Sequence, residues 1–179
     1  KSRGGVTLTG ETVRIEGAAE AAGAAILRPN DIVVRFLRLR RDLRVDNEDL
    51  GDAMTISSAS NVIVDHSSVS WGTDGLIDIT QRDQPQQEQP GMRVTLQWCF
   101  LHQTLRPHSK AILMRGKGNA RYTLHHCLVA HNEERSPRVS WFPRAGLDEG
   151  VKAEIVSNVI YNWDNRLLGR NPAGHSDRE

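Results

Sequence analysis

The most constraining feature of the sequence is a short β-branched run that recurs at a nearly constant spacing. If Ile32, Val62, Val94 and Tyr122 are taken as equivalent, the steps between them are 30, 32 and 28 residues. Each run ends in a similar polar turn, as expected for strands. A near-constant period in this range is typical of stacked supersecondary units. The recurrence therefore predicts a solenoid.

Further short strands are expected between these runs, and no intervening segment shows a convincing helical pattern. They begin near Ala53, Gly75, Lys110 and Arg138. Two or three strands in each period are typical of β-helix coils. We therefore predict an all-β, single-stranded right-handed parallel β-helix that forms one domain over residues 1–179, whole or truncated at one or both ends. A β-sandwich of many short strands is the alternative, but the constant spacing favours the solenoid.

Stacked coils place equivalent side chains in columns about 4.8 Å apart. The alignment predicts a column of small or polar side chains at the repeated turn, formed by Ser67, Cys99, Cys127 and, if the fifth run keeps its register, Asn158. A disulfide between Cys99 and Cys127 is geometrically possible, because the rung spacing falls within the permitted Cα separation. Packed free thiols are the commoner arrangement in such a column.

Two segments interrupt the repeat. Residues 41–51 are highly charged, and residues 81–91 are rich in glutamine and proline without apolar periodicity. Both are predicted to be excursions from the coils. Insertions in solenoids gather on one face, which is often the face that binds ligands, although a solvated loop explains the glutamine-rich segment equally well.

Composition narrows the choice of partners. The 23 basic and 22 acidic residues nearly cancel, so no general field favours nucleic acid or a membrane surface. We expect neither partner, no membrane span and a monomer. The first residues lack the apolar segment of a signal peptide, and two cysteines are too few for a disulfide scaffold.

The candidate metal ligands are Asp65, Asp74 and Asp78, because Ca²⁺ takes several oxygen donors and accepts water or a ligand carboxylate in the remaining positions. Strand alternation points Asp74 and Asp78 to the same face. Acidic residues near turns are more often solvated or cap a backbone group. A zinc site at the neighbouring histidines 125 and 126 is disfavoured, because adjacent strand residues point to opposite faces.

A second cluster is basic. Lys110 opens one strand, and Arg135 and Arg138 flank Pro137 before another strand, roughly one coil later. Guanidinium forks bind carboxylates in a bidentate manner, and a lysine adds a point charge. Together with the acidic cluster they suit an anionic ligand bridged by a metal ion. Exposed charges at turns are the plain alternative.

Five motifs occur in an order that is specific when they are taken together: residues 61–74, residues 75–78, residues 108–110, residues 134–139 and residues 157–163. Together they resemble polysaccharide lyase family 1, the pectate lyases, from about Val33 to Trp163. The resemblance implies calcium ligands at Asp65, Asp74 and Asp78, substrate binding by Lys110, and Arg135 as the catalytic arginine.

The resemblance also implies a reaction. Pectate lyases cleave α-1,4-linked polygalacturonate by calcium-dependent β-elimination, in which a proton leaves C5 and the glycosidic oxygen leaves C4. The expected partner is thus an acidic polysaccharide. An extracellular location follows from a polymer that lies outside the cell. Arg135 would take the C5 proton or act electrostatically, because a guanidinium normally stays protonated.

The sequence departs from the family pattern at Ser140, where a further substrate-binding arginine is usual, and Arg138 is the candidate to replace it. Because one fold serves several functions, two other classes of protein stay open: a β-helix glycoside hydrolase, which needs paired carboxylates, and a non-catalytic β-helix that binds acidic polysaccharide. The basic cluster favours a uronate ligand and elimination.

Overall fold

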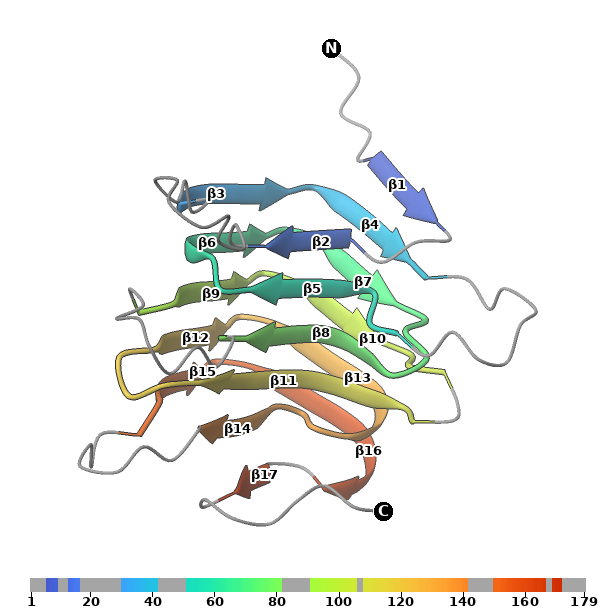
Figure 1. Ribbon diagram of the computed structural model, residues 1–179. Helices are drawn as coiled ribbons and strands as arrows, with labels where there is room; N and C mark the ends of the chain where they lie inside the picture. Colours follow the sequence, from blue (N-terminus) through green and yellow to red (C-terminus); the bar gives the residue numbers. More distant parts are fainter. Residues whose placement is uncertain are drawn as a thin grey trace.

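The computed structural model describes residues 6–9, 13–16, 30–41, 51–81, 91–105, 108–141, 150–166 and 169–171. Every regular element in these ranges is a strand, and all strand pairs are parallel. Successive strands turn around a common axis and stack in coils (Figure 1). The predicted parallel β-helix is therefore confirmed. The described part of the chain holds no helix that is long and apolar enough to cross a membrane.

The coils build three walls. The first wall consists of β3 (Asn30–Arg35), β6 (Ser60–Asp65), β9 (Arg93–Gln97), β12 (Arg121–His125) and β15 (Lys152–Val156). The second consists of β1 (Val6–Thr9), β4 (Leu37–Arg40), β7 (Ser68–Ser70), β10 (Phe100–His102), β13 (Leu128–Glu134) and β16 (Val159–Arg166). The third consists of β2 (Val13–Glu16), β5 (Met54–Ser57), β8 (Gly75–Thr80), β11 (Lys110–Gly116), β14 (Arg138–Trp141) and β17 (Gly169–Asn171). Pairing of Lys110 with Glu134 joins β11 to β13, and so the second wall to the third.

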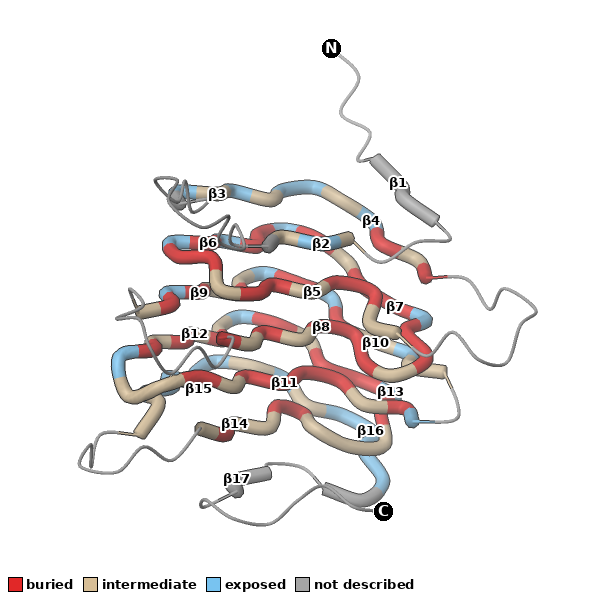
Figure 2. The backbone as a smooth tube through the Cα atoms, viewed as in Figure 1, coloured by how far each residue is buried: buried red, intermediate tan, exposed pale blue. Residues whose placement is uncertain are grey.

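The register predicted from the repeat is confirmed. Ile32 pairs with Val62, Val62 with Val94, and Val94 with Tyr122 along the first wall. Inward side chains of the three walls fill one continuous core. Figure 2 shows the buried residues along the backbone of the coils in the middle of the stack. Val62, Val64 and Leu96 are at most 1% exposed. Alternation along each strand gives the walls one apolar face and one outer face.

The predicted column at the turn is also present. Each coil passes from the first wall to the second through a single residue with positive φ, and the residue that follows points inward. The Cys127 backbone N–H donates to the Asn158 Oδ1 at 2.9 Å, and the Cys99 N–H lies 3.4 Å from the Cys127 Sγ. Side chains of one coil thus satisfy backbone groups of the coil before it. Both cysteines are buried free thiols.

The interruptions fall outside the described residues almost entirely. Residues 42–50 and 82–90, which hold most of the two predicted excursions, are not described. The strands on either side of them keep their pairing, because β5 and β8 are neighbours in the third wall and β6 and β9 are neighbours in the first.

Candidate active site

The outer face of the third wall carries the polar and charged side chains of interest. Ile77 and Ile79 of β8, and Ile112 and Met114 of β11, are at most 1% exposed and form part of the core. Alternation therefore turns Asp78, Thr80, Leu113 and Arg115 to the opposite, outer face. Asp78 pairs with Leu113, and Leu113 pairs with Arg138 on β14. This register brings two of the predicted site residues into one row.

Asp74 lies just before β8 and has two hydrogen-bonding partners, Lys110 and His108. The Lys110 Nζ donates to its Oδ1 at 3.0 Å, and the His108 Nδ1 lies 2.8 Å from the same oxygen. Desolvation opposes ionisation of this carboxyl group, but the hydrogen bonds from His108 and Lys110 outweigh it and lower the pKa of Asp74. The structure thus joins a predicted metal ligand directly to the predicted substrate-binding lysine.

Asp52 is a third carboxylate of this cluster, and it was not predicted from the sequence. Burial, followed by the charges of Asp78 and Asp74, raises its pKa to about 7. Its Oδ1 lies 2.6 Å from the point where a side chain at Gly75 would begin. The absence of a side chain at Gly75 therefore lets the Asp52 carboxylate approach the start of β8.

The backbone fixes this arrangement. The carbonyl of Gly51 accepts hydrogen bonds from the N–H groups of Thr73 and Asp74, both at 3.1 Å. Continued backwards, the register of β5 with β8 sets Gly51 beside Asp74 and Asp52 beside Gly75, so the two aspartates lie on neighbouring coils one residue out of step. The sequence carries no clear signal for this pairing, because the order is Gly-Asp at residues 51–52 and Asp-Gly at residues 74–75.

Asp78 stands on the outer face of β8, within the field of two arginines. Burial raises its pKa, while a hydrogen bond from Thr80 and the charges of Arg115 and Arg135 oppose that rise. Arg135 also acts on Asp52. Its backbone has a φ of 59° and its carbonyl accepts a hydrogen bond from the Ile112 N–H at 2.7 Å, which fixes the turn that carries it against β11. Arg135 therefore lies close to this group of carboxylates.

The predicted ligand Asp65 lies elsewhere. It ends β6 in the first wall, is 3% exposed, and binds the Arg35 Nε at 2.5 Å. The His66 Nδ1 lies 2.6 Å from its Oδ1 and the Gln97 Nε2 donates to it at 3.0 Å. Desolvation opposes ionisation, but these hydrogen bonds prevail and lower the pKa of Asp65. The structure does not bring Asp65 together with Asp74 and Asp78.

The donor set decides which metal ion this cluster could hold. Among the residues that the structure describes, no three His, Cys, Asp or Glu side chains stand close enough to enclose a metal. Asp52, Asp74 and Asp78 nevertheless offer the oxygen donors that Ca²⁺ takes, with water or a ligand carboxylate in the remaining positions. Burial is the largest cause of the raised pKa of both Asp52 and Asp78. By its chemistry, the donor set fits calcium.

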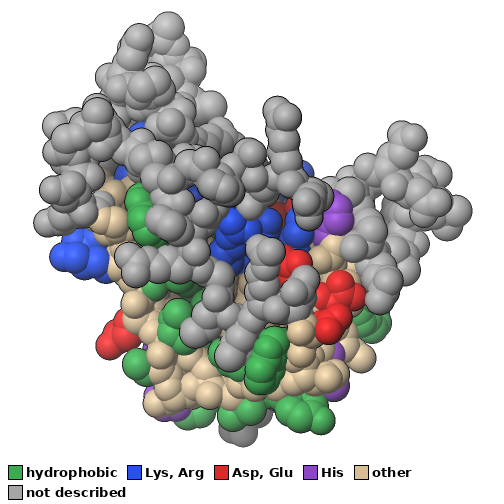
Figure 3. Space-filling view, turned by 90° about the horizontal axis from the view of Figure 1, so that it is seen from below, with side chains coloured by type: hydrophobic (Ala, Val, Ile, Leu, Met, Phe, Trp, Pro, Cys, Tyr) green, Lys and Arg blue, Asp and Glu red, His purple; other side chains and the backbone are tan. Residues whose placement is uncertain are grey.

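One face of the molecule carries charges of both signs. Figure 3 shows a group of Lys and Arg side chains with acidic side chains and a histidine beside it. The mixture can hold an anionic ligand through its cations while the carboxylates are available to a hard cation. Lys110, Arg135, Arg138, Asp74 and Asp78, all predicted from the sequence, belong to this wall or to the turns that lead into it.

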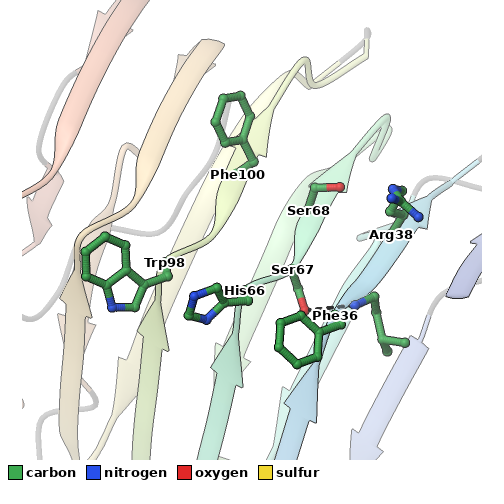
Figure 4. Close-up of a pocket in the computed structure, with 8 residues that line it drawn as sticks. Phe36, Arg38, His66, Ser67, Ser68, Trp98 and Phe100 are labelled. Carbon is green, nitrogen blue, oxygen red and sulfur yellow. Dashed lines mark hydrogen bonds between the residues drawn. The ribbon is translucent and has the colours of Figure 1, made fainter. Parts of the chain in front are cut away.

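A second surface feature lies at the first corner, which we define as the turn residues Phe36, His66, Trp98 and His126 between the first and second walls. Their ring centroids lie 5.6, 6.1 and 4.4 Å apart from one coil to the next. Figure 4 shows Phe36, His66 and Trp98 side by side across three coils. These three residues help to line a groove of about 410 Å³. Among the residues that the structure describes, the lining of this groove contains Arg38 and Phe100 and no acidic residue.

Fold and surface together define the class: a parallel β-helix protein with carboxylates and cations gathered on one wall. No family model matches the chain. Curated proteins named probable pectate lyase C do match it. The chain is 31% identical over 159 residues to the one from Emericella nidulans, which covers 88% of this chain and 32% of that protein.

Two further relatives agree. The protein from Aspergillus flavus is 33% identical over 175 residues, which is 97% of this chain and 36% of that protein, and the one from Aspergillus terreus is 30% identical over 159 residues, 88% of this chain and 33% of that protein. The chain spans about a third of the length of these relatives. The resemblance to the pectate lyases is confirmed, and this chain is their homologue over most of its length.

Proposed function

We propose that the protein is a calcium-dependent pectate lyase of polysaccharide lyase family 1 that cleaves α-1,4-polygalacturonate by β-elimination. The observation that carries the proposal is the meeting of Asp74 with Lys110, beside Asp52, Asp78 and Arg135, in a homologue of proteins named pectate lyase. A uronate polymer offers carboxylates to the cations, and such polymers lie outside the cell, so we propose an extracellular site of action.

In this proposal Lys110, Arg135 and Arg138 bind the carboxylates of the sugar chain. Fixed cations near the uronate stabilise the negative charge that develops when the C5–H bond breaks. Calcium held by Asp52, Asp74 and Asp78 would supply further charge neutralisation at the same carboxylate. The C4–O bond then breaks, a double bond forms between C4 and C5, and the leaving glycosidic oxygen takes up a proton. No water is consumed.

Arg135 is the residue we place at the C5 proton. A guanidinium normally stays protonated, so Arg135 has two candidate roles: it removes the C5 proton, or it acts as a fixed positive charge. Substitution distinguishes these roles. If Arg135 removes the proton, Arg135→Lys should be nearly as inactive as Arg135→Ala. If its charge alone matters, Arg135→Lys should retain a large part of the rate.

Ultraviolet absorbance of polygalacturonate solutions tests the proposal directly, because elimination creates an unsaturated product. The expected trace rises with calcium, stays flat in excess chelator, and stays flat with Arg135→Ala. Arg93→Ala, which removes an exposed arginine at the start of β9 in the first wall, is the matched control and should keep full activity. A flat trace with unshortened polymer would refute the lyase and leave a binding protein.

A hydrolase is the second candidate, and one observation favours it. Asp52 has a raised pKa and Asp74 a lowered pKa within one cluster, which is the division of roles between acid and base in glycoside hydrolases. Hydrolysis would generate new reducing ends without unsaturated product. The proposed lyase generates both in equal amounts, so the ratio of the two signals decides between the candidates.

A further inference from the structure

At the first corner, two neighbouring histidines bring their ring nitrogens together. The Nδ1 atoms of His125 and His126 lie 2.8 Å apart, and the two ring planes are nearly perpendicular, at 85°. The sequence argument that these neighbours point to opposite faces is wrong. His125 ends β12 and follows the inward Leu124, so it points outward, whereas His126 has a φ of 53° and leaves the strand alternation. Both rings therefore lie on the outside of the coil.

The separation of these nitrogens matches the spacing of two ligands on one metal ion. Imidazole nitrogens bind transition metals at about 2.0 Å. Two of them then stand about 2.8 Å apart if they form a right angle at the metal, and about 3.3 Å apart at the tetrahedral angle that zinc prefers. The distance of 2.8 Å fits the right angle, which is typical of tetragonal Cu²⁺ and Ni²⁺ sites.

Without a metal, the two neutral rings form a hydrogen bond in which one Nδ1 donates its proton to the other. A metal ion takes the place of that proton once the donor ring carries its proton on Nε2 instead. This change of tautomer leaves both rings neutral, so no charged group has to be displaced.

Stacking against Trp98 holds one of the two rings in position. The ring centroids of His126 and Trp98 are 4.4 Å apart and the ring planes are inclined by 21°, and His66 stacks on Trp98 from the preceding coil. His125 belongs to β12, which pairs with β9 on one side and with β15 on the other. Ligands that are held in place before binding lose little conformational freedom on binding, which raises affinity.

An equivalent pair two coils earlier shows that this arrangement comes from the corner itself. Asp65 ends β6, His66 follows with a φ of 45°, and the Oδ1 and Nδ1 atoms of the two residues lie 2.6 Å apart. The Asp65 carboxylate is also bound by Arg35 and Gln97, so it serves the fold. At residues 125–126 both donors are imidazoles, which suit transition metals.

We propose that His125 and His126 form a two-ligand site for a divalent transition metal ion, with Cu²⁺ bound most tightly and water in the remaining positions. Affinity for nitrogen ligands rises from Co²⁺ through Ni²⁺ to Cu²⁺ and falls again at Zn²⁺. Calcium prefers oxygen ligands and should not displace Cu²⁺ here. The site belongs to the first wall and the first corner, so it is independent of the carboxylates and of the reaction proposed for the third wall.

Titration of the protein with Cu²⁺ alone tests the site through tryptophan fluorescence, because bound Cu²⁺ quenches a neighbouring indole. We expect partial quenching that saturates at one equivalent. In His125→Gln and in His126→Asn, the dissociation constant for Cu²⁺ should rise by at least about tenfold, the lower limit for loss of a group that only supports a ligand. His66→Asn is the matched control. It removes the other ring on Trp98 at a position of positive φ that asparagine tolerates, and it should leave the dissociation constant unchanged.

Electron paramagnetic resonance of the Cu²⁺ complex counts the ligands. The spectrum should show nitrogen coupling from two imidazoles in wild type and from fewer than two in either variant of the pair. His125→Gln keeps the stack of His126 on Trp98, so its midpoint of thermal unfolding without metal should stay close to that of wild type. Equal dissociation constants in wild type and both variants, or displacement of Cu²⁺ by excess Ca²⁺, would overturn the proposal. The same loss in His66→Asn would also overturn it, because the stack and not the histidine pair would then determine binding.

Discussion

The third wall and the first corner are built by the same repeat but are used differently. The third wall gathers charges of both signs, and Asp52 and Asp74 are shifted from their ordinary pKa in opposite directions. The first corner gathers rings, with Phe36 54% and Trp98 52% exposed. On the third wall, a bound ligand could change the electrostatic interactions of the carboxylates. At the first corner, the rings are stabilised by contacts with one another.

The corner has a local backbone cost that its ring contacts offset only in part. Phe36, His66, Trp98 and His126 all have positive φ, between 45° and 58°, a conformation that costs such residues roughly 1 to 2 kcal/mol each. Aromatic pairs return about 0.5 to 1.5 kcal/mol each. Substitutions on the wall should therefore change function, and substitutions at the corner should change stability.

The largest loss of activity is expected for Lys110→Gln. The change removes the ammonium group that binds Asp74 and, in our proposal, the uronate. We expect kcat/KM on polygalacturonate to fall about a hundredfold, within the range for removing one preorganised charged donor. The midpoint of thermal unfolding should shift little. Activity within about threefold of wild type would contradict the placement of Lys110 at the ligand.

The next prediction compares the stability of Asp52→Asn with that of Asp65→Asn, both measured in the absence of calcium. Asp52→Asn should stabilise the protein at pH 8 by roughly 2 to 4 kcal/mol, because the folded state holds the Asp52 carboxylate unfavourably. The raised pKa makes this gain grow as the pH rises from about 4 to 7, and it vanishes below about pH 4. Denaturant unfolding at several pH values measures it.

Asp65→Asn should do the opposite. Its lowered pKa means that the ionised carboxylate stabilises the folded state above about pH 4 and that this contribution is lost as the pH falls further. We expect a loss of roughly 2 to 3 kcal/mol at pH 7 from the broken contacts with Arg35, His66 and Gln97. Calcium should still stabilise this variant but not Asp52→Asn. The reverse result would identify Asp65 as the ligand.

A smaller effect is expected at the first corner. Trp98→Ala removes ring contacts with His66 and His126, and should lower the free energy of unfolding by about 1 to 3 kcal/mol. The kcat/KM on polygalacturonate should not change. Phe100→Ala, an equally exposed ring outside the corner, is the control and should cost less. A loss of activity in Trp98→Ala would place the groove in substrate binding.

The smallest predicted effect belongs to Gly75→Ala. The added methyl group would stand 2.6 Å from the present position of the Asp52 Oδ1 and push that carboxylate away. Only a flexible side chain has to move, so stability should change by less than about 1 kcal/mol. The affinity for calcium, followed by calorimetry, should fall several-fold. Unaltered affinity would separate Asp52 from the metal site.

The repeat made most of the fold predictable. Its period fixed the register of Ile32, Val62, Val94 and Tyr122, and with it the inward column that contains Cys99 and Cys127. Periodic packing requires a similar residue pattern in every coil, so several segments of the sequence independently indicate the same arrangement. The rung spacing permits both a bridge and free thiols, so the sequence only favoured the free thiols that the structure has.

The site was less predictable because its members occur once each. Asp52 follows a charged segment and resembles an ordinary turn residue, and only the stacking of residues 51–52 against residues 74–75 reveals it. Asp65 was grouped with Asp74 by motif, yet the two end up on different walls, because the chain turns twice between them.

The in-register rows of the third wall also repeat equivalent side chains at a constant distance, one coil apart. A linear polymer lying along the axis meets a new rung of side chains about every 4.8 Å. In the proposed function, the number of sugar units that contact the protein at once is set by the number of coils. Insertion or deletion of a whole coil would lengthen or shorten the recognised segment of polymer without disturbing the chemistry of the rungs that remain.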